Sequence, residues 1–130
     1  MLTSLLEQHM NTICFGNDDG IGPAAELPVL EGIAYLQRMD ESHMCGSVAA
    51  PSADKPTCGR ISCSLDTAIW NCNYNDHYVS HPCRIFGDYA NDIYQKCTNW
   101  QLPMGWCTWG HNIDVDLGIG ASIGQLDGHC

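Results

Sequence analysis

Residues 58–76 read CGRISCSLDTAIWNCNYND, and this stretch decides the fold because it places three cysteines inside a pattern typical of β-structure. Apolar and polar side chains alternate over residues 61–65 and again over residues 68–74. This period of two predicts two β-strands, and the change of phase near Asp66 predicts a turn or a bulge between them.

Cysteine is the most informative residue type in the rest of the chain. Nine of the 130 residues are cysteine, against five Lys and Arg together, too few to lower the pKa of nine reactive thiols. Disulfide bonds formed in an oxidising compartment are the simplest interpretation. Cys63 and Cys72 lie on the apolar sides of their predicted strands, where we expect bridges to a packed helix. The expected disulfide cysteines are Cys14, Cys45, Cys58, Cys63, Cys72, Cys83, Cys97 and Cys107, and Cys130 is the candidate for the odd thiol.

Charge and length restrict the classes of function. The formal net charge is −10, with 15 Asp and Glu, which works against binding to nucleic acid and to anionic membranes. No stretch approaches the ~20 apolar residues that cross a bilayer. The length predicts a single domain over 1–130. The start, MLTSLLEQHM, lacks the features of a signal peptide, so we interpret the chain as a mature form whose leader has been removed.

Two amphipathic segments predict helices. Residues 25–41 carry one apolar stripe, and residues 84–97 carry another that ends at Cys97. Between the helices, residues 45–57 are rich in Gly, Pro and Ser and are expected to form a loop pinned by the cysteines at its ends.

The clearest predicted strand is 111–119, in which an expected buried face alternates with a wet one. The residues of that face are Ile113, Val115, Leu117 and Ile119. Turn residues make 1–24 a partly irregular N-terminal arm that Cys14 could tether. Together these elements predict an α+β fold, a small disulfide-stapled sandwich with two helices packed on one antiparallel β-sheet.

No motif predicts a catalytic, metal or cofactor site. The short-spaced ligand pairs of structural zinc sites are absent, and so are nucleophile motifs such as G-x-S-x-G. Asp114 and Asp116 share the wet face of the last predicted strand, where solubility is their simplest role. Asp18 and Asp19 in GNDDG are typical of a turn. We therefore expect no enzyme activity and no cofactor.

Aromatic residues provide the candidate binding surface. Residues 98–110 hold three of the four tryptophans, either as exposed anchors for a partner or as a cover for the core. Residues 74–83 form a second aromatic loop with the same two interpretations. The candidate residues are Tyr74, His77, Tyr78, Trp100, Trp106 and Trp109.

Part of the chain resembles small cysteine-rich proteins that filamentous ascomycete fungi secrete. In those proteins a C-x-R-[VI]-S-C-S segment runs into an A-I-W-x-C-N segment, followed by a helix ending in cysteine and a final strand. Here the matching stretches are Cys58–Ser64, Ala68–Asn73 and Ala90–Cys97, with Gly32–Gln37 upstream. The layout is more loosely similar to the α/β killer toxins of smut fungi.

The resemblance implies a secreted effector that acts in the plant apoplast by binding a host protein or a cell-wall component. It implies a virulence role, with recognition by a host receptor (avirulence) as a consequence, and it carries over no catalytic residue. Two alternatives remain, namely a killer-toxin-like growth inhibitor, against which the charge of −10 argues, and a small secreted glycan-binding protein or hydrolase that uses the tryptophans with Asp114 or Asp116.

Overall fold

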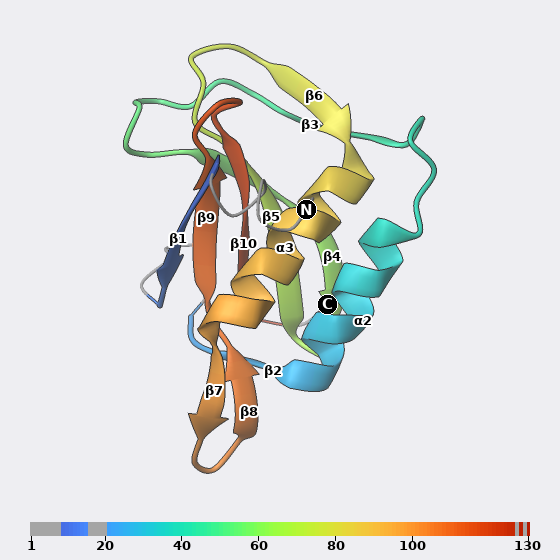
Figure 1. Cartoon of the computed structure of the whole chain (residues 1–130), viewed down its shortest axis with the longest axis vertical. Helices are drawn as coiled ribbons and strands as arrows, with labels where there is room; N and C mark the ends of the chain where they lie inside the picture. Colours follow the sequence, from blue (N-terminus) through green and yellow to red (C-terminus); the bar gives the residue numbers. More distant parts are fainter. Residues whose placement is uncertain (1–8, 16–20, 127, 129) are drawn as a thin grey trace.

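A computed structural model describes residues 9–15, 21–126, 128 and 130, and it has an α+β fold (Figure 1). The described residues form two helices, α2 (Glu26–Gln37) and α3 (Cys83–Cys97), which confirms both helix predictions. The strands in chain order are β1 (Met10–Cys14), β2 (Ala24–Ala25), β3 (Met44–Ser47), β4 (Thr57–Ser64), β5 (Thr67–Asn73), β6 (Val79–Pro82), β7 (Thr98–Gln101), β8 (Gly105–Thr108), β9 (Gly110–Asp114) and β10 (Ile119–Gln125).

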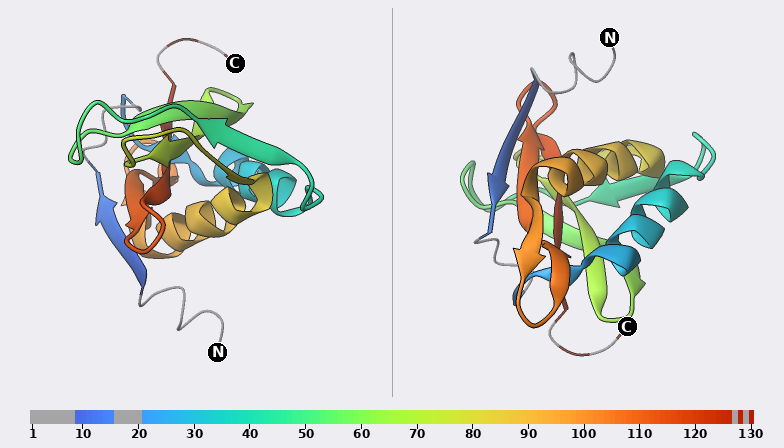
Figure 2. Two further views of the ribbon diagram at one scale, coloured as in Figure 1. Left: turned by 90° about the horizontal axis from the view of Figure 1, so that it is seen from above. Right: turned by 60° about the horizontal axis from the view of Figure 1, so that its bottom comes forward.

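The main sheet is antiparallel and has the strand order β1-β9-β10-β5-β4. Helix α2 contacts β4 and β5, helix α3 contacts β10, β1 and β9, and the two helices pack side by side (Figure 2). The predicted α+β class with antiparallel sheets is therefore confirmed. The expectation of one sheet was too simple, because the described strands also form a sheet β2-β8-β7 and a pair β3-β6. Strand β3 also replaces the start of the predicted 45–57 loop.

Two glycines permit close packing around the helices. A Cβ at Gly87 in α3 would lie 3.0 Å from the backbone nitrogen of Gln37 in α2, and one at Gly32 in α2 would lie 2.9 Å from Ser62 Oγ in β4. Between helices and sheet lies the main apolar core, which includes the fully buried side chains of Leu36, Ile69, Phe86, Tyr89, Ile93, Ile119 and Ile123.

The stretch that decides the fold forms the β4–β5 hairpin. Leu65 and Asp66 connect the strands with positive φ angles of 48° and 62°, as in the two-residue turns that suit the twist of a hairpin. The predicted turn near Asp66 is thus confirmed. The register also shifts between Arg60 and Ser62, which places a bulge in β4.

The predicted strand 111–119 is wrong in its extent and in its buried face. Strand β9 ends at Asp114, and the chain reverses through a turn in which Gly118 has a φ of 65°. Val115 and Leu117 are exposed, and Ile119 already belongs to β10. On β9 it is Asn112 and Asp114 that are buried.

Hydrogen bonds explain how these polar side chains are buried. The Asn112 amide donates to the backbone oxygen of Tyr89 over 3.0 Å and accepts from the backbone nitrogen of Ala121 over 3.0 Å. The Tyr89 hydroxyl donates to Asp114 Oδ2 over 2.7 Å, while Asp114 Oδ1 accepts from the backbone nitrogen of Asp116 over 3.0 Å. A buried polar group is tolerated when its hydrogen bonds are satisfied, and here they also dock β9 on α3.

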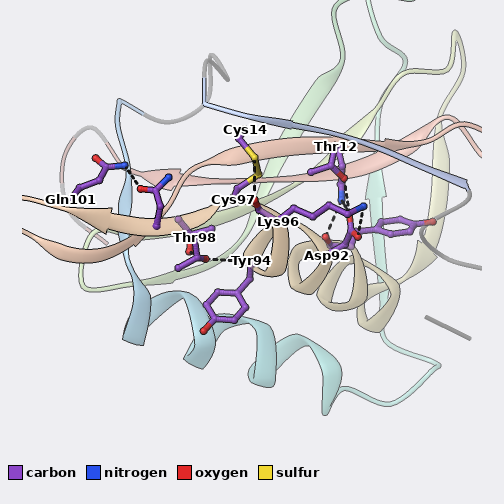
Figure 3. The surroundings of a disulfide bond; sticks show 12 residues. Thr12, Cys14, Asp92, Tyr94, Lys96, Cys97, Thr98 and Gln101 are labelled. Atoms are coloured by element: carbon purple, nitrogen blue, oxygen red, sulfur yellow. Dashed lines mark hydrogen bonds and ion pairs between the residues drawn. A yellow bond between two sulfur atoms is a disulfide. The ribbon is translucent and has the colours of Figure 1, made fainter. Parts of the chain in front are cut away.

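The same network reaches β1 through Asp92 of α3 (Figure 3). Asp92 Oδ2 accepts from Thr12 Oγ1 over 2.6 Å, and Asp92 Oδ1 pairs with Lys96 Nζ at 2.9 Å. Close by, a disulfide joins Cys14 of β1 to Cys97 at the end of α3. The predicted tether of the N-terminal arm is therefore confirmed, and part of that arm is a regular edge strand.

Four disulfides are present: Cys14–Cys97, Cys45–Cys83, Cys58–Cys72 and Cys63–Cys130. The odd thiol is the buried Cys107, so the assignment of Cys130 as odd and of Cys107 as bridged was wrong. The expected bridges from Cys63 and Cys72 to a helix were wrong too. Cys72 bridges across the hairpin to Cys58, and both Cys63 and Cys72 join a second apolar cluster with Ala68 and Trp70, apart from the helix-facing core.

Candidate binding surface

Two exposed tryptophans lie together on the hairpin of β7 and β8, residues 98–108, here called the tryptophan hairpin. Trp100 and Trp106 face each other across its strands, with ring centroids 5.7 Å apart and an interplanar angle of 80°. They are 59% and 52% exposed. Leu102 and Met104 at the tip are exposed as well. In Figure 1 the hairpin extends at the bottom of the molecule beyond both helices.

The sequence folds locally into this hairpin because its base is held on both sides. Helix α3 runs directly into β7, and Thr98 Oγ1 donates to the backbone oxygen of Tyr94 over 2.6 Å. Across the strands, the hydroxyls of Thr98 and Thr108 lie 2.6 Å apart, and β2 pairs with β8. Gly105 after the tip has a φ of 88°, a conformation that favours glycine. The apolar tip is therefore presented on an anchored support.

The tryptophan hairpin is electrically neutral in an acidic protein. Residues 98–108 contain no charged side chain, whereas the whole chain carries a formal charge of −10. The tip residues Leu102 and Met104 were missed as part of the surface by sequence reasoning. Their two-residue spacing from the tryptophans, on either side of a turn with Pro103 and Gly105, is a signal that could have identified them.

Trp109 does not join this surface. It is half-buried and makes an edge-to-face contact with Phe15, with ring centroids 6.0 Å apart. Of the three predicted tryptophans, Trp100 and Trp106 lie together on the hairpin, and Trp109 packs against the residue that follows β1.

The other predicted aromatic residues lie between β5 and β6, at the end of the molecule opposite the hairpin (Figure 1). Tyr74 is half-buried against the second cluster, and Tyr78 is exposed with its hydroxyl against Gly46 of β3. His77 Nδ1 lies 3.0 Å from Asp76 Oδ1, and this hydrogen bond lowers the pKa of the Asp76 carboxyl. These three residues do not extend the tryptophan hairpin.

The two carboxylates of the hydrolase alternative have different environments. Asp114 is buried and bonded to Tyr89, whereas Asp116 is exposed and its Oδ2 lies 2.6 Å from His9 Nδ1. The expectation that both share a wet strand face was wrong, because the strand ends between them.

Among the described residues, no group of three or more His, Cys, Asp and Glu side chains is placed to hold a metal ion.

Cys107 lies on β8 with its side chain in the interior. Its Sγ donates to the backbone oxygen of Gly105 over 3.4 Å, and burial raises the pKa of its thiol. A thiol with a raised pKa is a poor nucleophile, because the thiolate is the reactive form.

No helix within the described part of the chain is long and apolar enough to span a membrane.

Comparison with known protein families, with curated proteins and with solved structures finds no match for this chain.

Proposed function

We propose that this protein is a secreted, effector-type protein that acts without catalysis, by binding a host or apoplastic protein through the tryptophan hairpin. The observation that carries the proposal is the exposure of Trp100 and Trp106 together with the apolar tip of Leu102 and Met104. Exposed tryptophans on a rigid support are the side chains that most often dominate a protein interface. A patch of this kind on an otherwise acidic surface is typical of a binding site.

The shape of the patch favours a protein partner over a glycan. A sugar ring stacks on a flat aromatic face, but the two indoles stand at 80° to each other and form no shared platform. Leu102 and Met104 add flexible aliphatic and thioether surface, which suits an apolar pocket of a protein. The absence of charge over residues 98–108 favours an interface core rather than a polar rim.

The disulfides support action outside the cell. Four disulfide bonds are present in a chain of 130 residues, and such bonds persist in oxidising compartments. The resemblance to secreted fungal proteins supports the same environment, with the plant apoplast as the place of action. If a host receptor recognises the protein there, it acts as an avirulence factor.

The double variant Trp100→Ala/Trp106→Ala tests the proposal. The partner is first isolated from apoplastic fluid with the oxidised protein and identified, and its affinity is then measured in purified form. We expect the variant to bind at least about thirtyfold more weakly, because interface tryptophans typically contribute about 2 kcal/mol or more. The matched control is Val48→Ala/Val115→Ala, which removes exposed apolar side chains away from the hairpin and should leave the affinity unchanged.

Three outcomes would contradict the proposal. Retention of affinity in the tryptophan variant would show that the hairpin is not the interface. Specific binding to chitin or glucan that requires Trp100 and Trp106 would instead establish the glycan-binding alternative. Growth inhibition of fungal or root cells by the purified protein alone would favour the killer-toxin alternative.

A further inference from the structure

A second site lies apart from the hairpin, between helix α2 and strand β4. A pocket of about 360 Å³ opens there, and its walls include Glu31, Tyr35, Ile61, Ser62 and Ser64. Glu31 and Tyr35 are four residues apart on α2, so their side chains are neighbours on one helix face. Gly32 between them allows the helix to approach β4 closely, which forms the inner end of the pocket.

The bulge in β4 supplies the opposite wall. The register shift between Arg60 and Ser62 brings Ile61 and Ser62 to the same side of the strand. Ile61 packs against the helix-facing core, and Ser62 Oγ lies close to Gly32. Arg60, in contrast, pairs in register with Trp70, which belongs to the cluster on the other face of the sheet. The positive charge of β4 is thus directed away from the pocket.

The walls of the pocket combine three kinds of group. Glu31 provides a carboxylate, and in the described part of the chain no cationic side chain forms an ion pair with it. The Ser64 hydroxyl donates a long hydrogen bond to Glu31 Oε2, over 3.5 Å. Tyr35, which is 50% exposed, provides an aromatic face, and Ile61 provides apolar surface.

We propose that this pocket binds a lysine or arginine side chain of a partner protein. The ammonium or guanidinium group would pair with Glu31 and lie against the ring of Tyr35, and its aliphatic stem would lie on Ile61. The formal charge of −10 favours the approach of a basic group over that of an acidic one.

Strand β4 offers a way to deliver that side chain. It is an edge strand of the five-stranded sheet, and beyond Thr57 no strand in the described part of the chain pairs with its outer side. An extended peptide can therefore pair there while one basic side chain enters the pocket. The site does not depend on the function proposed for the hairpin, because no residue is shared between the two surfaces.

The test uses two capped tripeptides, acetyl-Val-Arg-Val-amide and acetyl-Val-Gln-Val-amide, titrated into the oxidised protein. Binding is followed by the amide chemical shifts of Gly32, Tyr35, Ser62 and Ser64. We expect the arginine peptide to shift these signals in a saturable way and the glutamine peptide to shift them at least several-fold less. Raising the salt concentration should weaken the binding of the arginine peptide.

Two variants separate a local from a general charge effect. Glu31→Gln and Asp54→Asn each remove one exposed negative charge, but only Glu31 lies at the pocket. We expect Glu31→Gln to weaken binding roughly fivefold, as for an exposed ion pair, and Asp54→Asn to leave it nearly unchanged. Tyr35→Leu should weaken binding as well, because it removes the aromatic face.

The proposal is overturned if the arginine peptide gives no saturable shifts at the pocket, if both peptides bind alike, or if Asp54→Asn weakens binding as much as Glu31→Gln. Both polar substitutions are at exposed positions, and their folding is checked by the complete set of native amide signals. None of these outcomes depends on the tryptophan hairpin, whose variant should bind the tripeptide normally.

Discussion

At the scale of single residues, Cys107 shows how burial controls chemistry. It is the cysteine outside the disulfides, it lies inside the protein on β8, and its thiol has a raised pKa. We expect no labelling of the native protein by a thiol reagent at pH 8, because the thiolate is scarce and shielded. Unfolding without a reductant should expose one thiol per chain, measured by mass after alkylation. Rapid native labelling, or more than one thiol, would contradict the assignment.

Tyr89 is a second residue with a measurable role. Its hydroxyl donates to the buried carboxylate of Asp114, so Tyr89→Phe leaves that acceptor with one bond fewer. We expect the free energy of unfolding to fall by about 1–3 kcal/mol, as measured by urea titration. Tyr35→Phe, at an exposed position on α2, should have little effect. An unchanged stability of Tyr89→Phe would show that the hydrogen bond contributes nothing.

The same tyrosine predicts a pH dependence. Burial, followed by the hydrogen bond to Asp114, raises the pKa of Tyr89 above the ordinary value of 10.0. A pKa that is higher in the folded state gives stability that is complete below pH ~10 and is lost as the pH rises further. We therefore expect alkaline destabilisation that is smaller in Tyr89→Phe. The reference protein and the Tyr89→Phe variant both carry Cys107→Ala, so that no thiolate attacks the disulfides. An identical loss of stability at alkaline pH in the two proteins would contradict the prediction.

At the scale of elements, Gly87 decides how closely the two helices pack. In an isolated helix Gly→Ala is stabilising by about 1 kcal/mol. Here the new Cβ would lie 3.0 Å from the backbone nitrogen of Gln37, which cannot move without shifting α2. We expect Gly87→Ala to destabilise the protein by about 1–3 kcal/mol in urea titrations. The exposed Gln95→Ala on the same helix should be neutral or slightly stabilising, and a stabilised Gly87→Ala would refute the close packing.

The elements also show which patterns in a sequence are informative. Both helices and the β4–β5 hairpin were predictable, because their apolar periodicity reflects the side that faces the core or the sheet. The alternation from Ile113 to Ile119 was misleading, because it runs through a turn and because the buried face of β9 is polar. Tyr89 and Asp92 of α3 supply part of the hydrogen bonds that make that burial favourable, and these two residues are separated from β9 in sequence. The signal that could have indicated the turn is Asp114 followed by Gly118.

The candidate binding surface was only partly predictable, because local sequence patterns do not show what the rest of the chain covers. Tryptophan spacing located the hairpin, but exposure depends on what the rest of the chain covers. Trp109 meets Phe15, a contact between distant parts of the sequence that no local pattern contains. The pocket between α2 and β4 likewise depends on a bulge and a close helix approach, which arise only on packing.

At the scale of the whole molecule, the disulfides set the stability. Peptide mapping under non-reducing conditions should recover Cys14–Cys97, Cys45–Cys83, Cys58–Cys72 and Cys63–Cys130. Loss of one native disulfide from a small domain typically costs about 2–5 kcal/mol, against a total stability of about 5–15 kcal/mol. We therefore expect full reduction to unfold the chain, as followed by circular dichroism. A reduced protein with an unchanged melting temperature would contradict this prediction.

The arrangement of the disulfides has a consequence for the resistance of the protein to proteases. The Cys14–Cys97 disulfide closes a loop over residues 14–97, and the Cys63–Cys130 disulfide closes a loop over residues 63–130. The two loops overlap, so every peptide bond between residues 14 and 130 lies inside at least one of them. A protease that cuts once anywhere between residues 14 and 130 therefore separates no fragment from the remainder. The nicked molecule stays covalently whole, and its surfaces survive damage that would dismantle an uncrosslinked chain.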